Sequence, residues 1–192
     1  MADDFVTPAE LSVWTGGKIL STDPRLPGLL AGAAAGIRRY CGWHIYPAVE
    51  ESLTLDGPGG DILPLPTMFL SAVDSVTEDG TVLDVWDQGD ETGDFEWSAN
   101  GEVRRLGAWW TERFRGVVVE VTHGYASAPA DIAQVVMQVC ASALSSPMGA
   151  TREQAIGFAA TWAMTAPGVA GGMSLLGRDL AVLDLYRMPG VV

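Results

Sequence analysis

Two cysteines and two histidines are the residues of this chain best suited to bind a metal ion. Cys41 and His44 form a C-x-x-H pair, whereas His123 and Cys140 stand well apart from each other. A structural zinc site needs four ligands, which usually come as two closely spaced pairs. Because His123 and Cys140 do not form such a pair, we predict that the chain has no metal ligands.

Nucleophilic catalysis is the second chemistry that these residue types suggest. A cysteine nucleophile needs a nearby histidine and a carboxylate that orients it, and the stretch from His123 to Cys140 also contains Asp131. Both cysteines fall on the apolar faces of expected helices, where a thiol behaves as a small buried hydrophobe. We therefore expect no catalytic residue and no bound cofactor. An enzyme that uses Cys41 or His123 is an alternative that a zinc assay and a thiol-reactivity test would reveal.

Two further kinds of stretch resemble ligand-binding loops. The acidic segment Asp87–Asp94 resembles a calcium loop, but it breaks the usual order of ligands and lacks the closing glutamate. The glycine-rich stretches at 57–60 and 168–172 do not lie between a strand and a helix, as a phosphate-binding loop requires. We interpret the first as an exposed acidic turn, and we predict no phosphate site.

A group of arginines near two adjacent tryptophans could line a nucleic-acid groove. The group consists of Arg104, Arg105, Trp109, Trp110, Arg113 and Arg115. The chain as a whole has 11 basic and 24 acidic residues and a formal net charge of −13, which disfavours binding to phosphate backbones. We therefore predict that the tryptophans pack against a sheet and that the arginines form a solvated rim.

Composition and length favour a single domain with an appendage. The chain has 192 residues, of which 48% are hydrophobic, so it can bury a core. Two cysteines cannot build a disulfide framework, and acidic residues stand at the N-terminus where a signal peptide would carry positive charge. The longest apolar run, Leu29–Ile37, is about half the length of a membrane span. We expect a soluble protein without a membrane partner that is made in a cytoplasm.

The N-terminal part of the sequence predicts two helices. Thr7, Pro8 and Glu10 form the signature of a helix start. A second helix is expected from about Pro24 or Pro27 to Gly42, because apolar residues recur there at spacings of three and four.

Short strands separated by turn residues follow, over about residues 49–123. The dipeptides Asp79-Gly80 and Asn100-Gly101 are hairpin signals, and the run Val117–His123 is the clearest strand. We predict a small antiparallel β-sheet region that is inserted between helices.

The C-terminal third has helical periodicity at both ends and a glycine-rich stretch between them. A helix is predicted from Pro129 to Ser145, and a short terminal helix from Asp179 to Arg187. Glycines and Pro167 between them argue against a long regular element. The predicted fold class is therefore α+β, with a helical core at 1–150 that contains the inserted sheet region and an extended C-terminal arm with a terminal helix at 151–192.

The order of these segments resembles a known family. The segments are "AAAGIRRYCGWHIYP" (33–47), "DGPGGDILPLP" (56–66), "LSAVDSVTEDGTVL" (70–83), "VVVEVTHGYASAPADI" (117–132) and "LAVLDLYRMPG" (180–190). This succession is similar to the head-to-tail adaptor (head–tail connector) proteins of tailed bacteriophages, of the siphophage type. It covers nearly the whole chain. Under this resemblance the "VTHGY" stretch is a scaffold in which Gly124 permits a bend and Pro129 starts a helix.

The resemblance implies a structural virion protein. Adaptors of this family form a ring, commonly of twelve subunits, at the head–tail junction below the portal protein. The ring extends the DNA channel, so that genomic double-stranded DNA passes through without tight binding, and it joins a head-closure or tail protein. The implied location is the neck of the virion, after assembly in the host cytoplasm.

Family members use the C-terminal segment to reach neighbouring subunits or the portal. In this chain the corresponding interface residues would be Phe158, Trp162, Leu180, Leu183, Tyr186 and Arg187. Another head-closure or tail-completion protein of similar build is the alternative within the same class of virion proteins.

Overall fold

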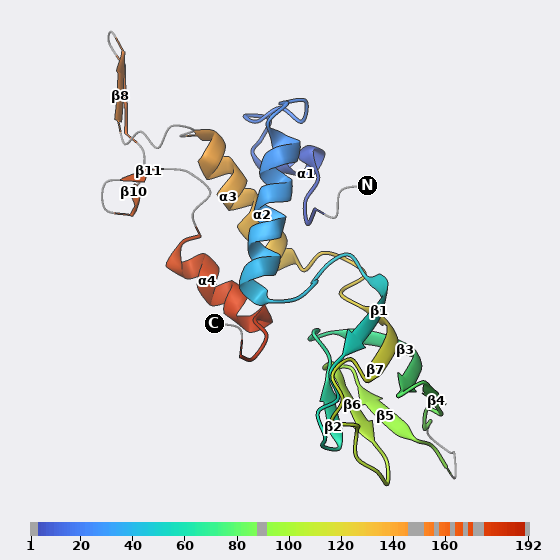
Figure 1. Ribbon diagram of the computed structural model, residues 1–192. Coiled ribbons are helices and arrows are strands. Elements are labelled where there is room, and N and C mark those ends of the chain that lie inside the picture. The colour runs from blue at the N-terminus through green and yellow to red at the C-terminus, as the bar shows by residue number, and fades with distance from the viewer. Residues whose placement is uncertain are drawn as a thin grey trace. The chain divides into compact units, whose positions relative to one another are not determined.

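The chain forms two compact units in the computed structural model, which describes residues 4–87, 92–145 and 175–190 and the backbone of four short strands within 152–170. The helical unit consists of residues 1–41 and 128–187, and the sheet unit consists mainly of residues 42–127 (Figure 1). Helices thus flank an inserted sheet region along the chain. The predicted α+β class is confirmed.

The first helix of the helical unit, α1 (Pro8–Trp14), begins as the sequence predicts. The Thr7 hydroxyl accepts a hydrogen bond from the Glu10 amide at 3.2 Å. The Glu10 carboxylate in turn accepts one from the Thr7 amide at 2.7 Å. This reciprocal pair satisfies two amides that the first turn would otherwise leave without partners.

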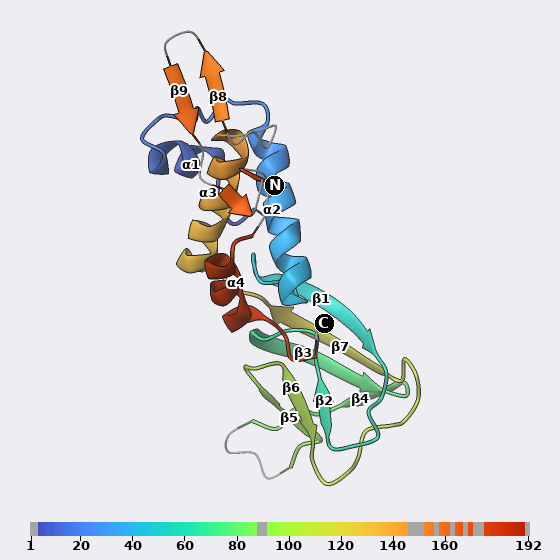
Figure 2. The same ribbon diagram turned by 90° about the vertical axis from the view of Figure 1, so that its left-hand side faces the viewer.

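Two longer helices, α2 (Leu26–Cys41) and α3 (Ala130–Ser145), lie side by side (Figures 1 and 2). Each buries the apolar stripe that its sequence predicts. The buried residues are Leu26, Leu30, Ala33, Ala34, Ile37 and Cys41 on α2, and Ile132, Val135, Val136, Val139, Cys140 and Ala143 on α3. These stripes form most of the core of the helical unit.

A short terminal helix, α4 (Gly177–Leu183), continues into a 3-10 turn, η1 (Asp184–Tyr186). It starts two residues before the predicted Asp179, because the Asp179 carboxylate accepts a hydrogen bond from the Leu176 amide at 2.9 Å and so fixes an earlier turn. The helix packs on α2 and α3 within the helical unit. The division of the chain into a core and an arm at residue 150 stays a prediction.

The sheet unit contains two antiparallel sheets. The larger sheet has the strand order β1-β7-β3-β4, formed by Val49–Leu55, Val117–His123, Leu70–Glu78 and Thr81–Leu83. The smaller sheet has the order β2-β6-β5, formed by Ile62–Pro64, Glu102–Arg105 and Phe95–Ser98. The strand predicted most clearly from sequence, β7, is therefore an inner strand that pairs with both β1 and β3.

Both hairpins predicted from dipeptides are present. Glu78 pairs with Thr81, and the two residues between them, Asp79 and Gly80, have φ angles of 48° and 86°. Positive φ at both positions is the geometry of a two-residue hairpin turn that matches the twist of the strands. The second hairpin joins β5 to β6 through Ala99, Asn100 and Gly101, and Gly101 has a φ of 86°.

The core of the sheet unit is built from the inner faces of both sheets. Along β7 the side chains alternate, with Val117, Val119 and Val121 buried and Glu120 exposed. They share one cluster with residues of the smaller sheet and its loops, namely Leu63, Leu65, Phe95, Val103 and Trp110. This alternation is typical of a sheet with one buried face and one solvated face.

Four strands of two to four residues lie between α3 and α4. The strands β8 (Arg152–Ala155) and β9 (Phe158–Thr161) pair with each other, as do β10 (Met164–Ala166) and β11 (Val169–Ala170). Their shortness agrees with the prediction that this stretch forms no long regular element. Within the part of the chain that the structure describes, no helix is both long and apolar enough to span a membrane.

Candidate interaction surfaces

Both cysteines are buried in the helical unit. Burial raises the pKa of the Cys41 thiol to about 11, and it raises the pKa of Cys140 to about 11 as well. The Cys41 thiol lies 3.7 Å from the carbonyl oxygen of Leu183, to which it donates. A thiol with such a pKa is almost wholly protonated at neutral pH, so neither cysteine has the character of a nucleophile.

The two histidines lie together in the sheet unit. Their rings meet edge to face, with centroids 5.9 Å apart. His123 is buried, and its Nε2 lies 3.1 Å from a carboxylate oxygen of Glu51, whereas His44 Nε2 donates to the Pro47 carbonyl at 2.6 Å. Among the described residues, no three histidine, cysteine or carboxylate side chains gather so as to hold a metal ion.

The "VTHGY" stretch has the scaffold geometry that the sequence suggests. Gly124 has a φ of 88°, and its amide donates to the Phe69 carbonyl at 2.9 Å. The Tyr125 amide then donates to Ile45 at 2.7 Å, and the Tyr125 ring stacks on Phe69 with centroids 4.5 Å apart. These contacts close the end of the larger sheet where β7 leaves it.

The glycines at 57–60 have a packing role that sequence did not indicate. They run beside the loop of residues 106–116 that joins β6 to β7, which we call the β6–β7 loop. A side chain on Gly57 would place its Cβ 2.0 Å from the Thr111 carbonyl oxygen, and one on Gly59 would lie 2.7 Å from Glu112. The two glycines therefore let the two loops approach closely, which is a common use of glycine.

Three of the four predicted rim arginines form ion pairs, and two of these three, Arg104 and Arg105, end strand β6. Arg104 pairs with Glu96. The guanidinium of Arg105 lies 3.2 Å from Glu78 and 5.8 Å from the ring centroid of Trp110. Arg104, whose side chain is 55% exposed, agrees with the predicted solvated rim. The prediction is wrong for Arg105, whose side chain is 12% exposed because it packs between these partners.

The prediction that both tryptophans pack against a sheet is right for one and wrong for the other. Trp110 is 2% exposed, and its indole nitrogen donates to the Asp61 carbonyl at 3.1 Å. Trp109 is 77% exposed, and further along the same loop Phe114 is 87% exposed. The backbone of Trp110 is tied to Gly60, so its side chain turns inward while that of its neighbour remains outside.

The basic residues beside Phe114 are also exposed. Arg113 has a side chain that is 76% exposed and lies 3.5 Å from the carboxylate of Asp79. Arg115, on the other side of Phe114, adopts a positive φ of 56° and donates its amide to Asp56 at 2.7 Å. The β6–β7 loop thus presents two aromatic rings and two guanidinium groups to solvent.

An apolar hollow of about 480 Å³ lies between α1 and α3 in the helical unit. We call it the α1–α3 groove. It is lined by Phe5, Val6, Ala9, Glu10, Val13, Trp14, Ala133 and Met137. Val13 on its rim is 81% exposed. Exposed apolar surface of this kind is typical of protein–protein interaction sites.

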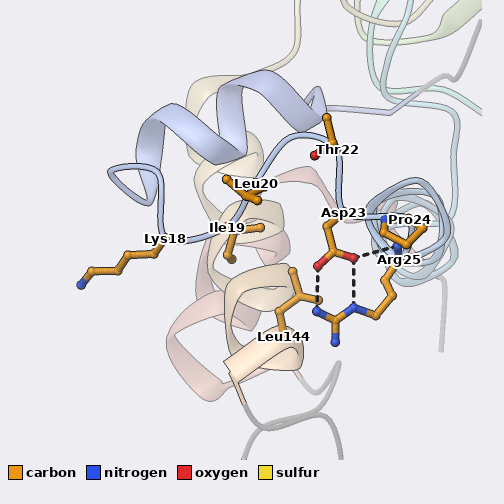
Figure 3. A pocket seen from close by; sticks show the side chains of 8 residues that line it. All are labelled: Lys18, Ile19, Leu20, Thr22, Asp23, Pro24, Arg25 and Leu144. Atoms are coloured by element: carbon orange, nitrogen blue, oxygen red, sulfur yellow. Dashed lines mark hydrogen bonds and ion pairs between the residues drawn. The ribbon is translucent and has the colours of Figure 1, made fainter.

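A second hollow in the helical unit, of about 700 Å³, is lined by residues of the connection before α2 and by Leu144 of α3 (Figure 3). Two of the three charged residues in its lining neutralise each other: Arg25 and Asp23 form a bidentate pair with a shortest distance of 2.7 Å, and the third is Lys18. Hydrogen bonds from Arg25 lower the pKa of Asp23 to about 2. The pair fixes the turn that leads into α2 (Figure 3).

The solvated face of the larger sheet is acidic. A shallow hollow of about 330 Å³ on it is lined by Glu50, Glu51, Ser52, Asp74, Glu120 and Val121. The strands β1, β3 and β7 contain no lysine or arginine. We call this surface the acidic face.

The interface residues predicted for the C-terminal segment fall into two groups. Trp162 and the side chain of Phe158 lie outside the described residues. The other four make contacts within the chain: Leu183 is buried, Leu180 is half-buried, Tyr186 donates to Asp131, and Arg187 lies 5.3 Å from the Tyr40 ring centroid. Their use in a partner interface stays a prediction, to which the structure adds an intramolecular role for these four.

The chain matches no protein-family model and no curated protein. It is similar in fold to solved structures from gene transfer agent (GTA) particles. A chain from the neck of a native GTA particle computed with C12 symmetry has 19% identity and a TM-score of 0.56, over 100% of this chain and 97% of that one. A chain from the neck of an empty GTA particle computed with C6 symmetry has 20% identity and a TM-score of 0.54, over 98% of this chain and 92% of that one.

A third structure, the virion of a native GTA particle, contains a chain with 19% identity and a TM-score of 0.57, over 98% of this chain and 94% of that one. The chain therefore has the fold of proteins found in the neck of a phage-like particle, along essentially its whole length. The resemblance drawn from the order of sequence segments is confirmed at the level of the fold.

Proposed function

We propose that this protein is a structural component of a virion neck, and more specifically a head–tail adaptor. Copies of the chain form a ring, commonly of twelve subunits, below the portal protein, and the ring joins the head to a head-closure or tail protein. The observation that carries the proposal is the similarity in fold, over the full length of the chain, to a chain from a neck computed with C12 symmetry.

The chemistry of the described residues supports a structural role rather than catalysis. The two thiols are buried and carry raised pKa values, and His123 and His44 make contacts that hold the end of a sheet. An active site needs a nucleophile or base that is accessible and oriented by neighbours. We therefore assign no catalytic residue to the chain.

A ring that lets DNA pass should not grip the phosphate backbone, because each phosphate contact made by a basic side chain adds salt-sensitive affinity. The net charge of −13 and the acidic face both support this role. We propose that duplex DNA passes through the lumen without tight binding. In the finished particle the protein is located in the neck, and before that in the host cytoplasm.

Removal of the gene from the parent phage tests the proposal. We expect full-size heads and free tails that fail to join, and restoration of joined particles when the wild-type chain is supplied. Cryo-electron microscopy of the restored particles should place this fold in a ring in direct contact with the portal. Normal joined particles in the absence of the protein would contradict a neck function.

The same images decide between an adaptor and the alternative, another head-closure or tail-completion protein. An adaptor contacts the portal directly, whereas a head-closure protein is separated from the portal by another ring. A ring of this chain that is one layer further from the portal would therefore favour the alternative.

A further inference from the structure

Two exposed apolar features are prominent among the residues that the structure describes. One is the β6–β7 loop with Trp109 and Phe114, in the sheet unit. The other is the α1–α3 groove with Val13 on its rim, in the helical unit. A soluble chain gains nothing from keeping large aromatic side chains in water, so each of these features is a candidate for an interface.

The β6–β7 loop is held in place by hydrogen bonds along its length. The Trp110 amide donates to Gly60 at 2.8 Å, and the Gly57 amide donates to Arg113 at 2.9 Å. The Thr111 amide donates to the Glu78 carboxylate at 2.6 Å. Because the backbone is already ordered in the free chain, docking of Phe114 would lose little conformational entropy.

The loop and the groove are complementary in both polarity and charge. Phe114 is flanked by Arg113 and Arg115, so an aromatic ring projects between two cations. The groove is apolar, and Glu10 is the charged residue of its lining. Asp4 precedes the lining residue Phe5 in the sequence, and the Arg38 guanidinium lies 5.3 Å from the Phe5 ring centroid.

The charge of Glu10 is maintained by its role in the helix start. Hydrogen bonds from the Thr7 amide and hydroxyl lower the pKa of Glu10, so it stays anionic at neutral pH. The loop carries acidic neighbours of its own, namely Asp56, Asp79 and Glu112, but Arg113 and Arg115 are the charges that border Phe114. An aromatic anchor with flanking arginines is typical of the residues that dominate binding energy at interfaces.

We propose that the β6–β7 loop of one copy docks in the α1–α3 groove of the neighbouring copy, with Phe114 inserted and Arg113 or Arg115 beside Glu10. This inference rests on the proposed ring. The contact joins two different surfaces of the same chain, and a head-to-tail contact of this kind closes into a ring when its rotation is a fraction of a full turn. The partner of the loop is therefore a second copy of this chain.

Disulfide trapping between two variants, each with one added cysteine, tests the contact. Val13→Cys places a thiol on the groove rim, and Glu112→Cys places one on the loop while Phe114, the proposed anchor, stays in place. The native Cys41 and Cys140 do not interfere, because they are buried and their pKa values are about 11. Particles assembled from an equal mixture of the two variants are oxidised, and the chains are then separated without reductant.

We expect a covalent dimer in the mixture, comprising up to about half of the chains if the variants mix at random around the ring. Particles made from either variant alone should give none. Dimers of Glu112→Cys with itself would indicate a symmetric loop-to-loop contact and would overturn the proposal. Rings that are present by microscopy but yield no dimer would overturn it as well, while leaving the proposed function intact. If the wild-type chain forms no ring, the proposed function itself fails.

A second measurement does not depend on cross-linking. Phe114→Ser should weaken ring formation at least tenfold while the circular dichroism spectrum stays that of the wild type. The matched control is Val82→Ser, which changes an exposed apolar residue of β4 outside both surfaces and should have no effect on ring formation. Unchanged rings together with a loss of DNA binding by Phe114→Ser would assign the loop to nucleic acid and contradict the contact.

Discussion

Tyr186, near the end of the described chain, places its hydroxyl oxygen 2.9 Å from each carboxylate oxygen of Asp131, in the first turn of α3. This contact joins η1 to a helix that begins more than fifty residues earlier, and it lies within the helical unit. Sequence alone assigned Tyr186 to a partner interface, so its role within the chain can be tested directly.

Tyr186→Phe should destabilise the isolated chain. The substitution removes one hydrogen bond to a charged group and retains the ring, so the free energy of unfolding should fall by about 1 to 2 kcal/mol. Urea denaturation followed by circular dichroism measures the change. Leu185→Ala is the matched control, because Leu185 is exposed and should contribute little. An unchanged unfolding curve for Tyr186→Phe, with a defect seen only in particle assembly, would support the partner role instead.

A second prediction concerns Cys41, whose thiol donates to the carbonyl of Leu183 in α4. Removal of residues 175–192 takes away α4 and η1 and exposes this thiol to water. Since burial is the largest cause of its raised pKa, the pKa should fall from about 11 toward the ordinary value of 9.0. Each unit of that change increases the thiolate fraction at pH 8 by about tenfold, so the rate of reaction with a disulfide reagent should rise steeply.

Mass spectrometry of the labelled protein locates the modified cysteine. Cys140 serves as the internal control. It lies in α3, its pKa is also raised by burial, and the hydrogen bond to Leu183 of α4 is made by Cys41 and not by Cys140. Equal labelling of both cysteines after truncation would mean that the whole helical unit has unfolded. Labelling as slow as in the intact chain would show that α4 does not protect Cys41.

Short sequence motifs correctly predicted turns and helix starts, because neighbouring residues determine these features. Asp79 and Gly80 determine a hairpin because only a few residue types adopt positive φ readily, and Thr7 with Glu10 determines a helix start for an equally local reason. The assignment of strands to two sheets was not predictable in this way. β7 pairs with β1 and β3, which lie far from it along the chain, and a local sequence pattern does not predict such long-range pairing.

The same limit applies to the interaction surfaces. Trp109 and Trp110 are adjacent and identical, yet one is exposed and the other is buried. The difference arises because the backbone of Trp110 is tied to Gly60, a contact between separate loops that sequence periodicity does not reveal. The apolar lining of the α1–α3 groove could have been suspected from Val13 and Trp14, which follow the buried Leu11 on a very short helix.

A third prediction tests the close approach of the two loops in the sheet unit. Gly57→Ala would bring a methyl group to within 2.0 Å of the Thr111 carbonyl oxygen, so the backbone must shift. Forced contacts of this kind typically cost about 1 to 3 kcal/mol of stability. Gly60→Ala is the control, because nothing lies within 4 Å of its added Cβ.

Tryptophan fluorescence during denaturation reports the effect, since Trp110 is buried beside these loops. We expect a lower midpoint for Gly57→Ala and an unchanged midpoint for Gly60→Ala. If the two variants unfold at the same denaturant concentration, the loops do not require glycine for their contact.

The last prediction concerns DNA. Arg104 and Arg105 are held in ion pairs with carboxylates, and the acidic face carries Glu50, Asp74 and Glu120 without a neighbouring cation on its strands. We therefore expect no detectable binding of the purified chain to duplex DNA in a gel-shift titration at about 150 mM salt, a concentration at which electrostatic binding through several phosphate contacts still persists. Micromolar binding that is lost when Arg104, Arg105, Arg113 and Arg115 are changed to glutamine would contradict this expectation.

Charge reversal on the acidic face gives the converse test. Glu50→Lys combined with Glu120→Lys places two cations on the adjacent strands β1 and β7. The two positions are near each other because Glu50 pairs with Thr122, which is two residues after Glu120 on β7. If the acidic face lines the lumen, this variant should slow DNA ejection from assembled particles, and the effect should weaken as salt is raised because each phosphate contact releases counterions. Asp61→Lys combined with Glu102→Lys makes the same change in net charge at exposed positions of the sheet unit outside the acidic face. Equal slowing by both variants would mean that net charge alone matters, whereas slowing by the first variant only would assign the acidic face to the wall of the channel.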